Sequence, residues 1–162
     1  TVVDATVGNG HDTLFLASLV GPEGKVIGFD IQQEAITQTA ERTAANGQVT
    51  LHRAGHERMA EFLSGSIQAA MFNLGYLPGG DKAVTTHSAT TLAALSAATE
   101  FLSEGGIITV ALYTGHPGGS NEAGSVIQWA RELPQDQYSV SKYEFINQRN
   151  SPPALLAIQK RS

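Results

Sequence analysis

The sequence predicts an α/β protein built on one open, mostly parallel sheet with helices on both of its faces. Short apolar runs of strand length alternate with helix-compatible segments along most of the chain, and parallel strands joined by crossover helices require this alternation. Turns that carry glycine, proline or asparagine separate the segments. Near the end, two apolar runs follow each other without a helix, so we expect the sheet to finish in an antiparallel hairpin.

Each predicted strand is an apolar run bounded by turn residues. In chain order, the strands are residues 1–5, 25–29, 48–52, 67–73, 107–113, 138–146 and 154–159. The predicted helices lie between the first six of these runs, at residues 12–19, 33–45, 57–63, 88–102 and 122–133. Turn signals set the boundaries: residues 21–24 end the first helix, Asn46 and Gly47 stop the second, and Gly105 and Gly106 open the fifth strand.

The composition is that of one globular domain. The chain has 162 residues, of which 41% are hydrophobic and 15% are charged. We expect a single domain over residues 1–162, with a short segment missing before the abrupt first strand. No apolar run is long enough to cross a bilayer, and the absence of cysteine excludes disulfides and thiolate metal sites, which fits a cytoplasmic protein.

The charge balance restricts the partners. A net charge of −5 argues against strong non-specific binding to nucleic acid, because lysine and arginine supply most of that affinity. A folded RNA could still be held by a local basic patch. Residues 137–162 contain Lys142, Arg149, Lys160 and Arg161 against a single acid, Glu144. This segment is either part of a basic face or an ordinary charged surface.

A glycine-bearing loop over residues 4–10 joins the first predicted strand to the first helix. Such a loop lets a ligand approach the backbone closely, although a tight turn without a ligand has the same pattern. The dinucleotide fingerprint needs a third glycine where Thr13 stands, and Asp12 would repel a pyrophosphate at the helix N-terminus. S-adenosylmethionine has no phosphate and is cationic, so nearby acids favour it.

Asp30 supplies the second signal for a cofactor. It ends the second strand, twenty residues after Gly10, where a carboxylate can accept hydrogen bonds from both ribose hydroxyls. It is also suited to cap the next helix, and the two roles are compatible.

The chain resembles the class I S-adenosylmethionine-dependent methyltransferases and, more narrowly, the YtqB-like family, also called MnmM. Four separated blocks carry this resemblance: residues 4–13, 73–81, 115–119 and 143–148. The resemblance implies a Rossmann-like fold with seven strands, the last antiparallel. It also implies S-adenosylmethionine as cofactor and, as acceptor, the amine of 5-aminomethyl-2-thiouridine at the wobble position of a tRNA anticodon stem-loop. Thr114 departs from the pattern, because a histidine is expected before Gly115.

The expected cofactor contacts come from the loop, the second strand end and two later positions. They are Asp4, Thr6, Gly8, Asn9, Gly10, Asp12, Thr13, Asp30, Gln32, His56 and Asn73. His56 is expected to flank the adenine, unless it is a loop histidine in water. Trp129 and Ile127 lie in a helical stretch and are expected in the core.

The loop after the fourth predicted strand is expected to hold the acceptor, since ligands bind beyond the carboxyl ends of parallel strands. Asn73 can accept a hydrogen bond from an amine, and Tyr76 can stack on a base. His116 and Asp81 are candidates to accept the proton. The alternatives are purely structural: Asn73 forms a turn, and Tyr76 packs against its neighbours.

Other functions stay open at this point. The same machinery could methylate rRNA or a small-molecule amine, and a non-catalytic S-adenosylmethionine-binding module is a further alternative. The five histidines have no zinc-like spacing, so no metal is expected. The sequence does not distinguish a monomer from a homodimer.

Overall fold

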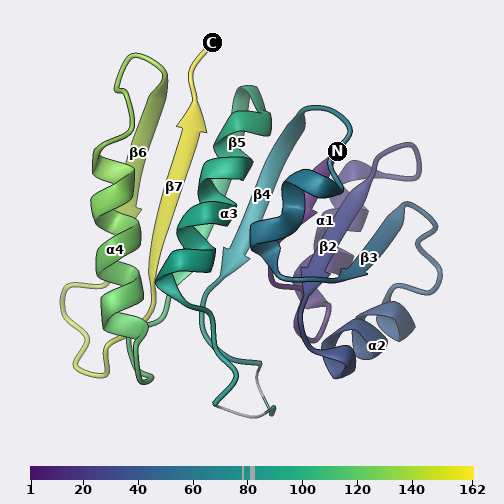
Figure 1. Ribbon diagram of the computed structural model, residues 1–162, viewed down its shortest axis with the longest axis horizontal. Coiled ribbons are helices and arrows are strands. Elements are labelled where there is room, and N and C mark those ends of the chain that lie inside the picture. The colour runs from purple at the N-terminus through teal and green to yellow at the C-terminus, as the bar shows by residue number, and fades with distance from the viewer. Residues whose placement is uncertain (78, 81–82) are drawn as a thin grey trace.

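Across the residues that the structure describes, 1–77, 79–80 and 83–162, seven strands form one sheet in the order β3-β2-β1-β4-β5-β7-β6 (Figure 1). The structure is a computed structural model. The strands are β1 (Val2–Asp4), β2 (Val26–Asp30), β3 (Val49–Arg53), β4 (Ile67–Asn73), β5 (Leu102–Leu112), β6 (Tyr138–Tyr143) and β7 (Ala154–Lys160). Strands β1 to β5 pair in parallel, and β7 pairs antiparallel with both β5 and β6. The predicted fold class and the terminal hairpin are therefore confirmed.

Helices cover both faces of the sheet (Figure 1). The helices are α1 (His11–Val20), α2 (Gln33–Arg42), the 3-10 helix η1 (His56–Glu61), α3 (Ser88–Phe101) and α4 (Gly119–Arg131). On one face, α1 and α2 pack against each other and against β1, β2 and β3. On the other face, α3 contacts both η1 and α4. This arrangement is the one that right-handed crossovers between parallel strands produce.

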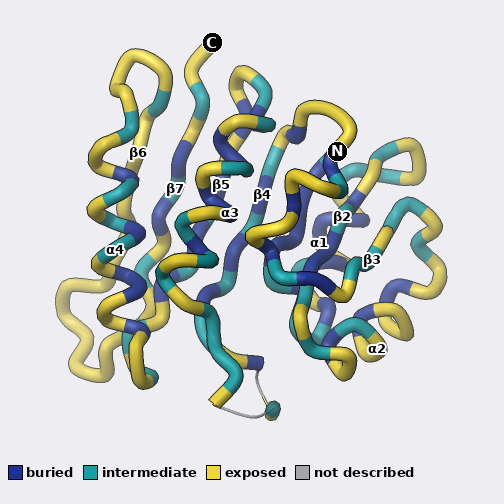
Figure 2. The backbone as a smooth tube through the Cα atoms, viewed as in Figure 1, coloured by how far each residue is buried: buried dark blue, intermediate teal, exposed yellow. Residues whose placement is uncertain are grey.

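The larger core lies between the sheet and the layer formed by η1, α3 and α4. Phe29, Met59 and Phe72 are among its largest fully buried side chains, and each contributes about 1.5 to 3 kcal/mol by leaving water. Ile127 and Trp129 pack against this core, so their expected place is confirmed. A smaller cluster around Leu16 and Val26 lies under α1. Figure 2 shows the central strands as mostly buried and the connecting loops as mostly exposed.

Several boundaries differ from those predicted. Strand β5 begins at Leu102 rather than at residue 107, because Leu102 pairs with Ile67 before the register shifts. The predicted helix 88–102 therefore ends one residue earlier. Helix α2 ends at Arg42 instead of residue 45, where the Thr43 hydroxyl donates back to the carbonyl of Thr39. Strand β6 ends at Tyr143 rather than residue 146, and the segment that follows it is exposed.

The loops that follow β1, β2, β4 and β5 gather at one edge of the sheet, and the chain's two ends lie toward the opposite edge (Figure 1). Carboxyl ends of parallel strands meet at such an edge, which is where open α/β sheets bind their ligands. Among the described residues, no helix combines the length and apolar character needed to span a membrane.

Candidate functional site

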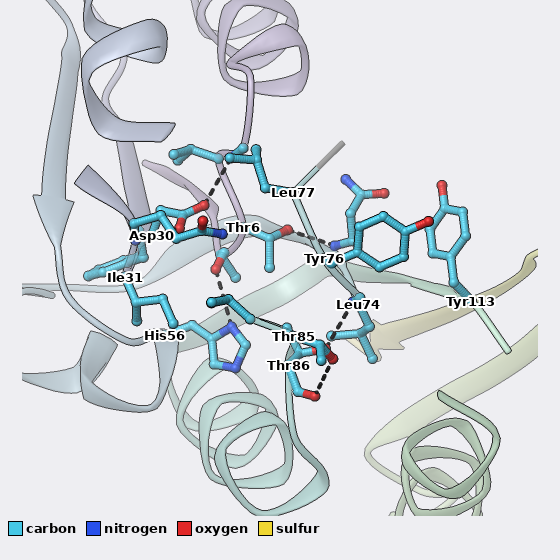
Figure 3. Close-up of a pocket in the computed structure, with 18 of the residues that line it drawn as sticks. Thr6, Asp30, Ile31, His56, Leu74, Tyr76, Leu77, Thr85, Thr86 and Tyr113 are labelled. Atoms are coloured by element: carbon cyan, nitrogen blue, oxygen red, sulfur yellow. Dashed lines mark hydrogen bonds between the residues drawn. The ribbon is translucent and has the colours of Figure 1, made fainter. Parts of the chain in front are cut away.

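A cavity of about 860 Å³ opens at the carboxyl ends of the parallel strands. Its lining comes from the loops after β1, β2, β3, β4 and β5. In Figure 3, Asp30, Ile31 and His56 lie on one side of the cavity, and Tyr76 and Tyr113 lie on the opposite side. The volume is within the range that holds a small-molecule ligand with room for part of a second one.

The charge of the lining is negative. Asp12, Asp30 and Glu57 line the cavity, and none of the described lining residues is a lysine or an arginine. A phosphate would be repelled by this set, whereas a cationic ligand would be attracted. The lining therefore fits a ligand that carries positive charge and no phosphate.

Two backbone amides hold the Asp30 carboxylate. The Gly8 amide donates to Asp30 Oδ2 at 3.1 Å, and the Gln32 amide donates to Oδ1 at 2.9 Å. Each carboxylate oxygen accepts more than one hydrogen bond, so the group keeps acceptor capacity toward the cavity. Ile31 follows it, half exposed, and also lines the cavity. The sequence did not single out Ile31, although an apolar residue directly after the carboxylate was a usable signal.

Helix α2 presses against the glycine loop. The Thr39 hydroxyl donates to the Gly8 carbonyl at 3.0 Å, and the backbone of Gly10 has a φ of 79°. A Cβ at Gly10 would approach Thr39 Cα to 2.9 Å, which is too close for any side chain. Gly10 is therefore required for the loop to pack on α2, and it does not line the cavity.

Three of the expected cofactor contacts do not reach the cavity. Asp4, Gly10 and Thr13 are absent from its lining, and both Asp4 and Thr13 are fully buried. Thr13 Oγ1 donates to Asp4 Oδ2 at 2.6 Å, and the Thr6 amide donates to Oδ1 at 3.2 Å. In this structure these three residues fix the loop from below, and their contribution to cofactor binding stays a prediction. Thr6, Gly8, Asn9 and Gln32 do line the cavity.

Burial raises the pKa of Asp4 from 3.8 to about 6, although the hydrogen bonds from Thr13 and Thr6 act in the opposite direction. Because the folded value lies above the unfolded value, ionisation of Asp4 costs stability. The penalty is absent below about pH 4 and complete above about pH 6. It is on the order of 3 kcal/mol, since one pKa unit corresponds to about 1.4 kcal/mol.

We expect Asp4→Asn, which cannot ionise, to remove this penalty. The free energy of unfolding of the variant, relative to the parent, should rise by most of this penalty, about 2 to 3 kcal/mol, between about pH 4 and about pH 8, because the Asp4 carboxyl of the unfolded chain is already partly ionised at pH 4. Denaturant unfolding of both proteins at the two pH values measures it, and the other titrating groups cancel in the difference. If the difference in free energy of unfolding between parent and variant does not change with pH, the pKa of Asp4 is not raised by folding.

His56 is buried rather than a loop histidine in water. Its Nδ1 lies 3.2 Å from the carbonyl oxygen of Ala5, and a carbonyl only accepts, so Nδ1 carries the hydrogen. Burial lowers the pKa of His56, while the Ala5 carbonyl and nearby carboxylates, Glu57 first, act to raise it. The side chain is thus an uncharged wall of the cavity near Asp30 (Figure 3).

Asn73, at the end of β4, is held by two groups from the first β-α unit. Its backbone amide donates to Thr6 Oγ1 at 2.7 Å, and its side-chain Nδ2 donates to Asp12 Oδ2 at 2.6 Å. A carboxylate offers only acceptors, so the amide nitrogen must face Asp12 and Oδ1 is left as an acceptor. Both Asn73 and Asp12 line the cavity. Asn73 Oδ1 is therefore the atom of this side chain that can receive an N–H.

A buried carboxylate pins the loop that follows Asn73. Glu122, on α4, accepts from Thr86 Oγ1 at 2.7 Å and from Thr91 Oγ1 at 2.6 Å. Thr86 in turn exchanges two hydrogen bonds with Gly75: its Oγ1 accepts from the Gly75 amide, and its own amide donates to the Gly75 carbonyl, each at 2.9 Å. Gly75 has a φ of 140°, a region that favours glycine. The sequence did not identify Glu122, which is almost fully buried.

Tyr76 and His116 meet at the far side of the cavity. Their ring centroids are 5.9 Å apart in an edge-on arrangement, and both residues line the cavity together with Tyr113. The Nε2 atom of His116 is buried without a hydrogen-bond partner in the described part of the chain, so it has capacity for a ligand atom or a proton. Asp81, the other proton acceptor expected, lies outside the described residues. No set of three or more metal-binding side chains occurs among those that are described.

Known structures share this architecture. A "putative rRNA-methylase" from Clostridium thermocellum superposes with a TM-score of 0.95 at 47% identity, covering 98% of this chain and 87% of that one. A "putative methyltransferase" from Streptococcus mutans, solved in complex with SAH, gives a TM-score of 0.90 at 37% identity with the same coverage. The fold is that of the class I, Rossmann-like methyltransferases.

The family model described as "Putative rRNA methylase" matches residues 26–159, and the chain belongs to this family. A chloroplast protein of Arabidopsis thaliana, named tRNA (mnm(5)s(2)U34)-methyltransferase, is 38% identical over 174 residues. That alignment covers 99% of this chain but only 63% of the relative. The chain therefore spans less than two thirds of the length of this curated relative.

Proposed function

We propose that the chain is an S-adenosylmethionine-dependent N-methyltransferase that acts on the aminomethyl group of 5-aminomethyl-2-thiouridine at the tRNA wobble position. The observation that carries the proposal is the two-sided cavity, with carboxylates on one side and an oriented amide beside aromatic rings on the other. The name of the chloroplast relative supports this acceptor. When bound, S-adenosylmethionine supplies a methyl group on a positively charged sulfur.

The cofactor side is formed by the glycine loop and the end of β2. In this proposal Asp30 accepts from the ribose hydroxyls, and Ile31 and the uncharged His56 offer apolar surface for the adenine. Asp12 and Glu57 add negative charge, which favours a cationic ligand. The acceptor atoms of Asp30 and the negative charge of the lining fit S-adenosylmethionine, and the same negative charge disfavours the pyrophosphate of a dinucleotide.

The acceptor side would orient an amine and accept its proton. Asn73 Oδ1 receives an N–H from the amine, which fixes the nitrogen while Asp12 holds the amide in place. Tyr76 packs against the pyrimidine ring, and His116 Nε2 can take a proton as the nitrogen becomes substituted. Methyl transfer of this kind depends chiefly on the alignment of the amine nitrogen with the methyl group, and fixed side chains of the protein provide that alignment.

An rRNA acceptor is the second candidate, because the family model carries that description. A non-catalytic binding module is less well supported, since a carrier protein has no use for an oriented amide, nor for a buried histidine nitrogen that has no hydrogen-bond partner among the described residues. A cytoplasmic location stays a prediction from composition, and the Arabidopsis relative is named as chloroplastic.

The proposal is tested by mass spectrometry of nucleosides from tRNA that carries 5-aminomethyl-2-thiouridine. Incubation with the protein and S-adenosylmethionine should convert this nucleoside to its N-methylated form, and omission of the cofactor is the control. Ribosomal RNA incubated in parallel tests the second candidate. Methylation of rRNA alone would replace the tRNA assignment, and methylation of neither would contradict both.

We expect Asp30→Ala to weaken binding of S-adenosylhomocysteine about tenfold or more, because hydrogen bonds to a charged acceptor contribute about 1.5 to 3 kcal/mol. Isothermal titration calorimetry measures the affinity. Glu41→Ala is the matched control, since Glu41 is an exposed acid on α2 outside the cavity lining. Equal affinities of Asp30→Ala and the parent would remove Asp30 from the ligand site.

A further inference from the structure

An apolar strip continues from the cavity mouth across the sheet edge. Its members are exposed apolar side chains from β5, β6, β7 and their loops: Tyr113 (43% exposed), Leu155 (41%), Tyr143 (65%) and Phe145 (47%). The rings of Tyr143 and Phe145 contact each other edge-on, with centroids 5.7 Å apart. A contiguous group of exposed apolar side chains beside a cavity is a candidate interaction site.

Strand register places the strip on one face. Ala111 pairs with Leu155, and Leu155 pairs with Tyr143, so the three side chains form one row across the sheet. Their neighbours Leu112 and Leu156 are buried on the opposite face, which α3 and α4 cover. Within the described part of the chain, α1 and α2 pack on β1, β2 and β3, and the row on β5, β7 and β6 stays exposed.

The strip is continuous with the cavity. Tyr113 belongs to both, and Ser151, from the loop between β6 and β7, also lines the cavity. Because β6 and β7 are antiparallel, this loop lies at the same edge of the sheet as the carboxyl end of β5 (Figure 1). If one unit of a polymer enters the cavity, the neighbouring units would therefore lie along the strip.

The positive charges of the C-terminal segment are divided between the two ends of this hairpin. Arg149 is exposed in the loop beside the strip, whereas Lys142 pairs with Leu156, so its side chain lies on the opposite face of the sheet, where it forms an ion pair with Glu144. Lys160 and Arg161 lie at the other end, where they donate to the Leu102 carbonyl and to the Ser139 hydroxyl. The four cations therefore do not share one face, which favours the ordinary charged surface over the basic face that the sequence also left open, and only Arg149 accompanies the strip.

We infer that this strip is a stacking platform for the single-stranded nucleotides next to the one that is methylated. This inference rests on the proposed function, and it adds the surface that recognises the rest of the loop. Aromatic faces stack on any base, and the cationic group of Arg149, in the loop beside the strip, can contact a phosphate between two bases. So little positive charge suits a short single-stranded stretch rather than a duplex.

The test uses Tyr143→Ala and Phe145→Ala, with Phe15→Ala as the matched control, because Phe15 is an exposed aromatic residue on α1 outside the cavity lining. The substrate is an anticodon stem-loop RNA with 5-aminomethyl-2-thiouridine at the wobble position. In each strip variant the KM for this RNA should rise about tenfold, and kcat should stay near the parental value. Fluorescence anisotropy of the labelled RNA should show the same loss, and S-adenosylhomocysteine affinity should stay at the parental value.

The possible failures are distinguishable. If the parent does not methylate the RNA, the proposed function fails first. If the parent is active and both strip variants match Phe15→Ala in KM and RNA affinity, the platform is wrong. Sedimentation velocity provides the last check: a parental dimer that the strip variants dissociate, with RNA affinity unchanged, would assign the strip to contact between copies of the chain.

Discussion

Asn73→Ala should reduce methyl transfer by roughly a hundredfold or more while cofactor affinity stays near the parental value. Alanine removes the oxygen that is proposed to receive the amine, and a misplacement of about 1 Å at a reacting atom costs about this much in rate. The fold should tolerate the change, because the backbone bond from the Asn73 amide to Thr6 Oγ1 does not need the side chain. The loss should appear in kcat as well as in kcat/KM.

Single-turnover methylation of the modified stem-loop measures the rate, and titration with S-adenosylhomocysteine measures the affinity. Asn121→Ala is the control, because Asn121 is an exposed asparagine on α4 that is absent from the cavity lining. A parental rate for Asn73→Ala at saturating RNA would leave Asn73 as a turn residue. An equal loss of cofactor affinity would instead place the side chain on the cofactor side.

Glu122→Ala should lower both stability and activity. Its removal leaves the hydroxyls of Thr86 and Thr91 without their acceptor, which should lower the free energy of unfolding by about 2 to 3 kcal/mol. The loop from Gly75 to Thr86 then loses its anchor on α4, so kcat should fall about tenfold or more under conditions where the variant is still fully folded. Glu122 acts here as a positioning residue, because it does not line the cavity.

Glu122→Gln separates this role from stability alone. Glutamine keeps the length and one acceptor oxygen, so it should recover a large part of kcat. Denaturant unfolding, kcat and S-adenosylhomocysteine affinity are measured for both variants, beside Glu100→Ala, which removes an exposed acid from α3. A Glu122→Ala protein that is destabilised but turns over at the parental rate would show that Glu122 supports only the fold.

The order of strands and helices could be predicted because it depends on local patterns. Apolar runs, the Asn46-Gly47 stop and the missing helix before the last strand are all readable within short windows. The boundaries of β5 could not be predicted in this way, because pairing of Leu102 with the distant Ile67 decides where the strand begins. Tertiary pairing thus overrides the local helical preference around residue 102.

The sequence predicted which loops form the site, but it predicted few of the contacts between their residues. Asp30 and Asn73 follow strands, so their place at the sheet edge was foreseeable. The bond from Asn73 to Asp12 joins residues 61 apart, and no pattern in the sequence reports it. Glu122 had a usable signal, since it occupies the buried stripe of α4 with Gly119, Ala123 and Val126. A charged residue in an apolar stripe predicts a buried hydrogen-bond partner, because an unpaired charge is costly to bury.

The position of β7 has a consequence for how the chain is made. This strand is the last along the chain, yet it lies between β5 and β6 in the sheet. Until residues 154–160 have left the ribosome, β5 has an unpaired edge, and β6 has no neighbour in the sheet. Strand β5 is rich in isoleucine, valine and leucine, so a nascent chain stalled before Ala154 would offer other chains an apolar template for aggregation. Residues 154–160 thus protect the newly made protein as well as completing its sheet.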